Sequence, residues 1–174
     1  MESYSVISLI FGFLILFALI ILYFINQVIF RKNMVEKKFS AVLVGLEARV
    51  SLIDNLVKFI NNNLESETLL QKKLLKMNEV IKLLLNGSRD LKELKKLDKH
   101  FNHFTELENT YSFLEGNKKY LSLKEECLLN KNRVDYSFIG YDDSVKKYNE
   151  YKDKKLISIL NKIINFSNYD YYGE

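Results

Sequence analysis

The side chains best suited to metal chemistry are His100, His103 and Glu106, which follow one another at intervals of three residues. On a helix this spacing places all three on one face. A metal site needs three or four converging ligands, and surface helices often carry such spacings without binding a metal. Because the chain has two histidines in total, the sequence predicts no metal site.

Covalent catalysis has one candidate nucleophile, Cys127, which is the single cysteine of the chain. Cys127 lies on an apolar helical stripe, so we expect it to be a buried packing residue. The chain contains no Gly-rich phosphate loop, no Gly-x-Ser-x-Gly and no HExxH motif. The sequence therefore predicts a protein that is not an enzyme and that has no cofactor. A lone cysteine cannot form an internal disulfide, which is compatible with a reducing compartment.

Arg49 is distinctive because it is a charged residue within an apolar stripe. A guanidinium in such a seam needs hydrogen-bonding partners or a route to water. Antiparallel pairing of the first and last helices puts Arg49 level with Val134 and makes Asn132 and Asp135 the nearest polar candidates. We favour a structural polar layer that fixes helix register. Snorkelling of the side chain to solvent and a ligand site are the alternatives.

Nucleic-acid binding requires a dense basic stripe, whereas the net charge here is only +4. The lysine pairs are scattered along the chain and interleaved with acidic residues, as expected for solvated helix faces. The sequence thus predicts no nucleic-acid partner. The pairs are Lys72-Lys73, Lys95-Lys96, Lys118-Lys119 and Lys146-Lys147.

The strongest signal is a stretch without charge, since no Asp, Glu, Lys or Arg occurs between Glu2 and Arg31. Residues 6–25 are nearly all apolar, and twenty helical residues span roughly 30 Å, the thickness of a bilayer's hydrocarbon core. No basic segment precedes the stretch, so it does not resemble a cleaved signal peptide. We predict a short N-terminal segment at 1–5 and a transmembrane helix at 6–30.

Orientation in the membrane follows from four cations that come just after the span, Arg31, Lys32, Lys37 and Lys38. The positive-inside rule predicts an extracytoplasmic N-terminus and a cytoplasmic C-terminal part, in the inner or plasma membrane. The same cations are also suited to binding anionic lipid head groups. Both roles remain open.

The region after the span contains apolar residues at helical spacing, divided by turn signals at 61–63, 86–88 and 116–117. No stretch alternates as a strand does, and the chain has no proline to interrupt a helix. We predict an all-α protein, in which an antiparallel up-down four-helix bundle at 31–150 precedes a Lys/Tyr-rich tail at 151–174. The first bundle helix is expected to continue directly from the span.

The tail carries Tyr169, Tyr171 and Tyr172, which lie outside the predicted helical stripes. Three placements remain open for these tyrosines. They would cap the base of the bundle, lie at the level of the lipid head groups, or form a docking tail.

The order of several motifs resembles the LemA family. In the first bundle helix the motif runs Asn33-x-Val35-x3-Phe39-Ser40, then Arg49-x2-Leu52-Ile53-x-Asn55-Leu56-Val57. Later segments that resemble the family are Tyr111-x2-Leu114-x2-Asn117-x2-Tyr120, Asn132-Arg133-Val134 and Tyr141-Asp142-Asp143-Ser144-Val145-x2-Tyr148-Asn149. Phe39 stands where the family usually has tryptophan, and Asp54 where it has proline.

The resemblance implies one N-terminal membrane helix and a helical bundle in a bacterial protein, and it implies no activity. We therefore expect a scaffold or adaptor that binds another protein through its helix faces. The alternative is a membrane-surface structural protein that acts through anionic lipids or through self-association. A sensor with Arg49 as counter-charge is a third, weaker reading. The candidate site residues are Asn33, Ser40, Arg49, Asn55, Asn132, Asp135, Tyr141, Tyr148 and Asn149.

Overall fold

The computed structural model describes residues 2–64 and 66–173, with side chains for 8–64, 66–154, 157–162 and 164–173. The predicted segments 1–5 and 151–174 therefore each have one end, Met1 and Glu174, outside the described residues. Within those ranges the chain is helical, with turns and irregular connections but no strand. The predicted all-α class is confirmed.

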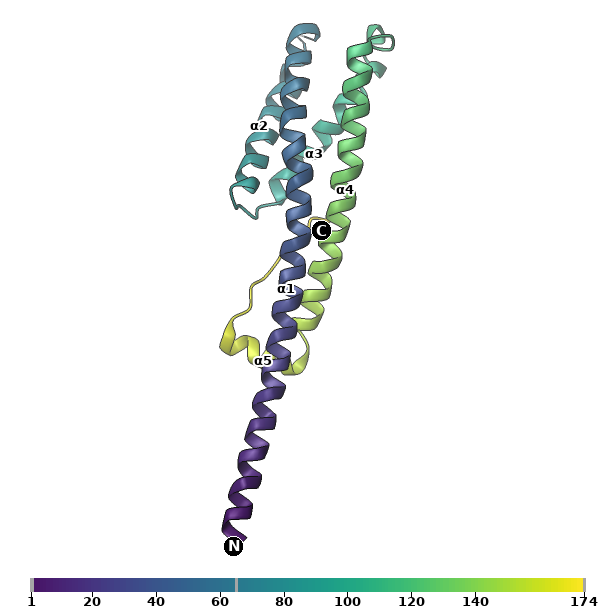
Figure 1. Cartoon of the computed structure of the whole chain (residues 1–174). Helices are drawn as coiled ribbons and strands as arrows, with labels where there is room; N and C mark the ends of the chain where they lie inside the picture. Colours follow the sequence, from purple (N-terminus) through teal and green to yellow (C-terminus); the bar gives the residue numbers. More distant parts are fainter. Residues whose placement is uncertain (1, 65, 174) are drawn as a thin grey trace. The chain divides into compact units, whose positions relative to one another are not determined.

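The elements follow one another as helices joined by short connections, with two 3₁₀ turns between α3 and α4 (Figure 1). They are α1 (Glu2–Asn63), α2 (Thr68–Leu85), α3 (Lys92–Phe104), η1 (Leu107–Asn109), η2 (Ser112–Leu114), α4 (Lys118–Lys152) and α5 (Lys155–Ile164).

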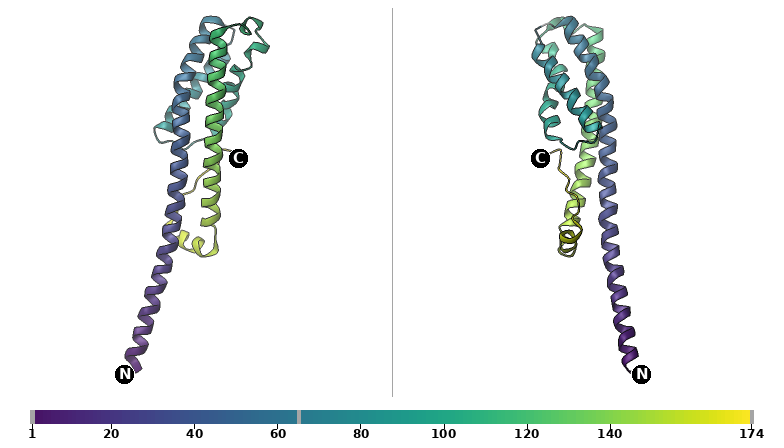
Figure 2. Two further views of the ribbon diagram at one scale, coloured as in Figure 1. Left: turned by 45° about the vertical axis from the view of Figure 1, so that its right-hand side comes forward. Right: turned by 90° about the vertical axis from the view of Figure 1, so that its left-hand side faces the viewer.

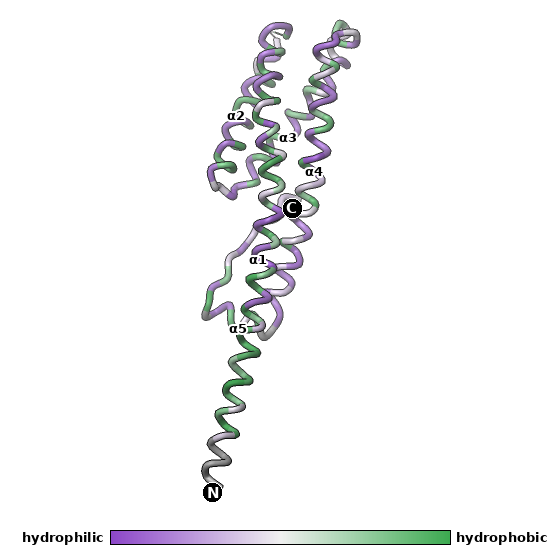
Figure 3. The backbone as a smooth tube through the Cα atoms, viewed as in Figure 1, coloured by the Kyte–Doolittle hydropathy of each residue, from purple (hydrophilic) through white to green (hydrophobic). Residues whose placement is uncertain are grey.

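Helix α1 is continuous over 62 residues, which confirms that the apolar segment runs directly into the first bundle helix. The absence of proline allows this length. Of the described helices, α1 is the one long and apolar enough to cross a membrane, and none of its most apolar window is buried. In Figure 3 the N-terminal part of α1 that follows the grey end is mostly green, the colour of hydrophobic residues.

Predicted turn residues end or begin helices at the expected places. Gly87 has φ +101°, and its N–H donates to the Leu84 carbonyl, while Ser88 N–H donates to the Leu83 carbonyl. This pair of bonds satisfies the last carbonyls of α2, and the positive φ favours glycine. At the start of α4, the Asn117 side chain accepts the Tyr120 N–H at 3.0 Å and so caps the helix.

Some local expectations were wrong. The predicted third helix stops at Phe104, where the Tyr120 hydroxyl donates to the terminal carbonyl at 3.2 Å. Before α2 the Ser66 hydroxyl is hydrogen-bonded to the Tyr111 hydroxyl at 2.7 Å. The tail predicted after residue 150 contains α5, whose ten residues include six apolar ones. This apolar content distinguishes the segment from a loose polar tail.

The chain divides into two compact units, and each unit is built from two separate stretches of the sequence. The N-terminal unit consists of residues 1–37 and 143–169, and the core unit of 38–142 and 170–174. The predicted boundaries at 30/31 and 150/151 differ from these, because α1 and α4 each contribute to both units.

In the core unit, α2 and α3 form a hairpin beside α1 and α4 (Figures 1 and 2). The predicted stripes of α1, α2 and α4 are buried throughout, which confirms the assignment of their inward faces. The finer prediction of an up-down four-helix bundle remains a prediction, since the short α3 and the additional α5 depart from four equivalent helices. Buried stripe residues of the unit include Phe39, Val42, Leu46, Ile53, Leu74, Met77, Ile81, Phe101, Leu123 and Phe138.

Candidate functional site

Arg49 is fully buried in the core unit, at a point where three helices meet. Its Nε donates to Asn130 Oδ1 of α4 at 2.8 Å, and its Nη1 donates to Asp98 Oδ1 of α3 at 2.6 Å. The guanidinium carbon lies 4.4 Å from the centre of the Phe101 ring. Arg49 is therefore held by a charge, an amide and an aromatic face, so it does not snorkel to solvent.

Close approach of α1 and α4 allows this arrangement. A Cβ atom at Gly45 would lie 2.9 Å from Val134 Cγ2, so any larger residue there would force the Val134 side chain or the helices to shift. Asn130 also donates from Nδ2 to the Gly45 carbonyl at 3.1 Å. The glycine thus places the amide of Asn130 between the α1 backbone and the Arg49 side chain.

Two aspartates, Asp98 and Asp135, lie close to Arg49 in this polar centre. Burial raises the pKa of Asp135, the charge of nearby Asp98 raises it further, and Lys131 and Arg49 oppose both effects. Arg49 Nη2 is buried and has no hydrogen-bond partner among the described residues. Arg49 and the two aspartates form a polar cluster whose pairing is incomplete.

The C-terminal segment completes the cluster. The Tyr172 ring stacks on Phe138 with centroids 3.5 Å apart, and its hydroxyl is hydrogen-bonded to Asp98. Asp142 accepts the N–H groups of Tyr172 at 2.8 Å and Gly173 at 2.9 Å. Burial, with help from the Asp98 charge, raises the pKa of Tyr172. Tyr172 is thus neutral at physiological pH and is part of the core unit.

Cys127 lies close enough to Arg49 to feel its charge. Burial raises the pKa of the Cys127 thiol to about 12, although the Arg49 charge opposes the increase. The thiol is therefore protonated near neutral pH, and a protonated thiol is a poor nucleophile. Its full burial agrees with the predicted packing role.

Comparison with protein-family models matches residues 38–174 to the LemA family. The chain belongs to the LemA family. The matched region begins at the first residue of the core unit and includes α5 and the C-terminal segment. None of the curated proteins compared with the chain matches it.

The polar partners of Arg49 differ from those predicted within the LemA motif. Asn132 is exposed and makes no bond to Arg49, whereas Asn130, half a turn earlier on α4, does. Asp135 is half-buried and acts on the centre through its charge. The predicted register was wrong by about one helical turn, because Val134 lies beside Gly45 and not beside Arg49.

Other LemA motif positions lie away from the centre. Asn33, Ser40 and Asn55 are exposed on α1. In the core unit, the buried Tyr141 donates to the Asp170 carbonyl at 2.9 Å. In the N-terminal unit, the buried Tyr148 donates to the Ser167 carbonyl at 2.8 Å.

Asn149, the last motif residue, is half-buried in the N-terminal unit. Its Oδ1 is buried without a hydrogen-bond partner among the described side chains. The structure thus distributes the motif over both units and does not gather it into one site.

The two departures from the LemA pattern have structural partners. Asp54, in place of proline, accepts a hydrogen bond from the buried Asn78 of α2 at 2.8 Å. Phe39, in place of tryptophan, lies between the Arg89 guanidinium, 4.0 Å from its ring centre, and the Tyr141 ring at 5.4 Å. Asp54 and Phe39 therefore each make contacts within the core unit.

The basic residues that follow the candidate membrane span differ in their exposure. Lys32, Lys37 and Lys38 are exposed, while Arg31 is half-buried and lies 4.6 Å from the centre of the Tyr151 ring. Among residues 2–64 and 66–173, no group of three or more His, Cys, Asp or Glu could hold a metal ion.

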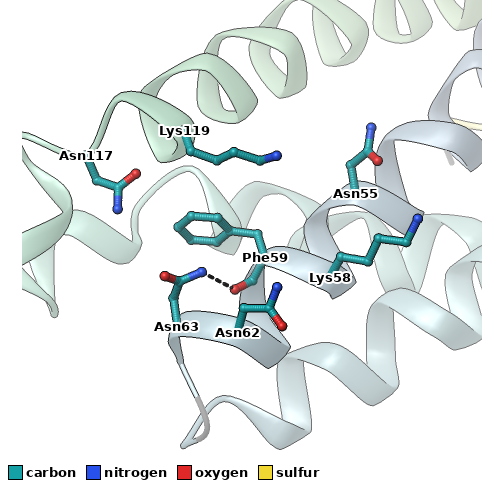
Figure 4. A pocket seen from close by; sticks show the side chains of 7 residues that line it. All are labelled: Asn55, Lys58, Phe59, Asn62, Asn63, Asn117 and Lys119. Carbon is teal, nitrogen blue, oxygen red and sulfur yellow. Dashed lines mark hydrogen bonds between the residues drawn. The ribbon is translucent and has the colours of Figure 1, made fainter.

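A separate surface pocket of about 380 Å³ lies in the core unit, where α1 ends and α4 begins (Figure 4). Phe59 lies among polar side chains, and Asn63 Nδ2 donates to its carbonyl at 2.8 Å. The other lining residues are Asn55, Lys58, Asn62, Asn117 and Lys119. Amides and lysines suit a polar peptide surface more than an apolar ligand.

Asp98, Asn130 and Tyr172 are the residues of the centre that sequence reasoning missed. Asp98 follows Leu97 within the apolar pattern of α3, so an isolated acid there was a usable signal. Asn130 and Tyr172 carried no local signal, because their roles depend on contacts across 81 and 74 residues of chain respectively.

Proposed function

We propose that this chain is a bacterial single-pass membrane protein that works as a scaffold or adaptor and catalyses no reaction. Helix α1 supplies the membrane span, and the core unit supplies a binding face for an amphipathic helix of a partner protein. The observation that carries the proposal is an exposed apolar stripe on α4.

The stripe consists of five large apolar residues with exposed fractions between 41% and 80%. Their spacing places them within roughly 100° of helix circumference, on the face opposite the buried one. From first to last they extend about 27 Å, or five turns. The residues are Leu121, Leu128, Leu129, Tyr136 and Ile139.

A pocket of about 340 Å³ opens beside this stripe, between α1 and α4 of the core unit. Leu52 and Leu129 supply apolar walls, and Asn130 and Arg133 supply polar ones. An exposed apolar row beside a pocket is the geometry in which partner helices dock with residues at i, i+3, i+4 and i+7.

The membrane part of the proposal combines the apolar α1 segment with the cations that follow it. We propose an inner or plasma membrane location with the N-terminus outside and the core unit in the cytoplasm, supported by Arg31, Lys32, Lys37 and Lys38. The variants Ser3→Cys and Ser40→Cys, each treated in intact cells with a membrane-impermeant thiol reagent, test this orientation. We expect labelling at position 3, and labelling at position 40 would contradict the orientation.

Photo-crosslinking in native membranes tests the adaptor role. A photoreactive amino acid replaces Ile139 in the full chain, with Leu83 on α2, a residue of 61% exposure outside the stripe, as the matched control. We expect one reproducible partner from position 139 only, and we expect Leu129→Glu to abolish the crosslink. Capture of lipid or of further copies of this chain alone would contradict the proposal.

The second candidate is a membrane-surface structural role, favoured by the exposure of Lys32, Lys37 and Lys38. Replacing these three lysines with Gln would then abolish binding to anionic vesicles, since each is worth on the order of 1 kcal/mol at such a surface. Unchanged vesicle affinity would rule this role out.

A further inference from the structure

Helix α5 belongs to the N-terminal unit and is strongly amphipathic. Six of its ten residues are apolar, and it ends at Asn165, whose left-handed φ of 53° stops the helix. Ile157 is buried at 1% exposure, whereas Ile159 is 58% and Ile164 is 42% exposed. One part of the apolar face therefore packs within the protein, and another part faces outward.

The outward part forms a groove with the apolar segment of α1. The groove has a volume of about 220 Å³, and all six lining residues are apolar: Phe17, Ile20, Ile21, Phe24, Ile159 and Leu160. The four residues from α1 all lie within the stretch 6–25 and cover about 10 Å of helix rise. The groove therefore lies beside the last turns of the membrane-spanning stretch.

Charged and aromatic side chains lie near the same end of the unit. Two cations lie against the Tyr151 ring, with the Arg31 guanidinium carbon at 4.6 Å and Lys154 Nζ at 5.0 Å from the ring centre. Lys154 and Lys162 are exposed. Tyrosines and cations of this kind are typical of the level at which lipid head groups meet the hydrocarbon region.

We propose that α5 is a second membrane-contacting element, an interfacial helix whose groove with α1 holds a lipid acyl chain. The proposal rests on the membrane position of α1 given above. Three observations select lipid as the occupant: the continuity of the groove with the spanning stretch, its purely apolar lining, and the adjacent cations that complement anionic head groups. Amphipathic helices of this kind lie in the interface plane, with the apolar face about 5–10 Å deep.

This contact gives the chain two attachments to the bilayer, one through α1 and one through the segment that follows α4. Within the N-terminal unit, residues after α5 return to α1, where the Tyr169 hydroxyl donates to Glu36 at 2.6 Å. Lys152 is also hydrogen-bonded to Asn168. Residues 143–169 would then be held at the membrane surface as one piece.

Spin-label accessibility of the full chain in phosphatidylcholine and phosphatidylglycerol vesicles tests the proposal. Labels are placed through Ile159→Cys and Ile164→Cys, with Lys162→Cys as the matched control on the polar face of α5. Phe13→Cys, at 68% exposure within the apolar stretch of α1, reports on the span itself. Cys127 is buried, so we expect no label to attach there in the folded protein.

We expect the labels at 159 and 164 to lose accessibility to a water-soluble nickel complex while they remain accessible to oxygen, as at position 13. The label at 162 should remain accessible to nickel. If the labels at positions 159 and 164 are as accessible to nickel as the label at 162, while the label at 13 is in lipid, the α5 proposal alone is overturned. If the label at 13 is also accessible to nickel, the proposed membrane location is contradicted as well. Protection from both reagents with spin–spin broadening would identify a second copy as the occupant.

Discussion

Helix α1 places its apolar side chains in opposite ways along its length. Between residues 8 and 20 large apolar residues on all sides of the helix are exposed, such as Leu14 at 55% and Phe17 at 55%. Between residues 35 and 60 the apolar residues occupy one stripe, and Leu46 and Ile53 are completely buried. A single unbroken helix thus has one part with the length and composition of a membrane span and another part that packs against partner helices.

The difference shows what gives each part its stability. None of the most apolar window of the first part is buried within the protein, so under the proposed membrane location the bilayer would cover its exposed side chains. The second part depends on close packing of apolar side chains and on the polar centre around Arg49, and both are sensitive to single substitutions. Amino-acid substitutions that destabilise one part of α1 and leave the other unaffected therefore test this difference between the two parts.

The largest effect is expected at the polar centre. Arg49→Met leaves the Asp98 carboxylate without its cation, and breaking a buried ion pair costs about 3–5 kcal/mol. We expect the lower end of this range because Asp98 is 17% exposed. Urea unfolding of the full chain in detergent, followed by tyrosine fluorescence, measures the loss. Combining the change with Asp98→Leu should restore much of the stability; a loss below about 1 kcal/mol for Arg49→Met would show that the pair is dispensable.

The same substitution in the two parts of α1 tests the comparison directly. Leu46→Ala creates a cavity and should lower the unfolding free energy of the core unit by about 2–5 kcal/mol. Leu14→Ala should leave that quantity within about 0.5 kcal/mol of the original, as a surface substitution does. Equal losses for the two variants would mean that the apolar segment packs like a core helix.

A smaller effect is expected at the C-terminal segment. Tyr172→Ala removes the stacking on Phe138 and the hydrogen bond to Asp98, which together predict a loss of about 2 kcal/mol. Tyr136→Ala is the matched control, because that tyrosine is 80% exposed. Indistinguishable denaturation midpoints for the two variants would place the segment outside the stabilising core.

The smallest effect depends on pH. Because the pKa of Asp135 is raised in the folded protein, its ionised form opposes folding. The contribution of protonated Asp135 to stability is fully present below the pKa that this carboxyl has in the unfolded chain. It is lost as pH rises through the higher pKa of the folded protein. Asp135→Asn should therefore raise the thermal midpoint near neutral pH and leave it unchanged well below the ordinary carboxyl pKa. A lower midpoint at neutral pH would show that the carboxylate is a favourable partner of Arg49.

Much of the fold was predictable because its signals are local. The apolar stripes of α1, α2 and α4 follow from residue spacing, and the ends at Asn63 and Gly87 follow from turn chemistry. The uncharged stretch before Arg31 predicted the candidate span in the same way. The amphipathic pattern of α5 was also present in the sequence, but the lysines around it made the segment look like a polar tail.

The sequence by itself determined which residues point inward, since helical periodicity depends only on the spacing of apolar and polar side chains. It also showed that Arg49 would need partners. Only the tertiary structure decided that Asp98, Asn130 and Tyr172 surround it. Helical periodicity does not determine the axial position of one helix relative to its neighbour, which can differ by whole turns. Here the close contact of Gly45 with Val134 sets the axial position of α1 against α4.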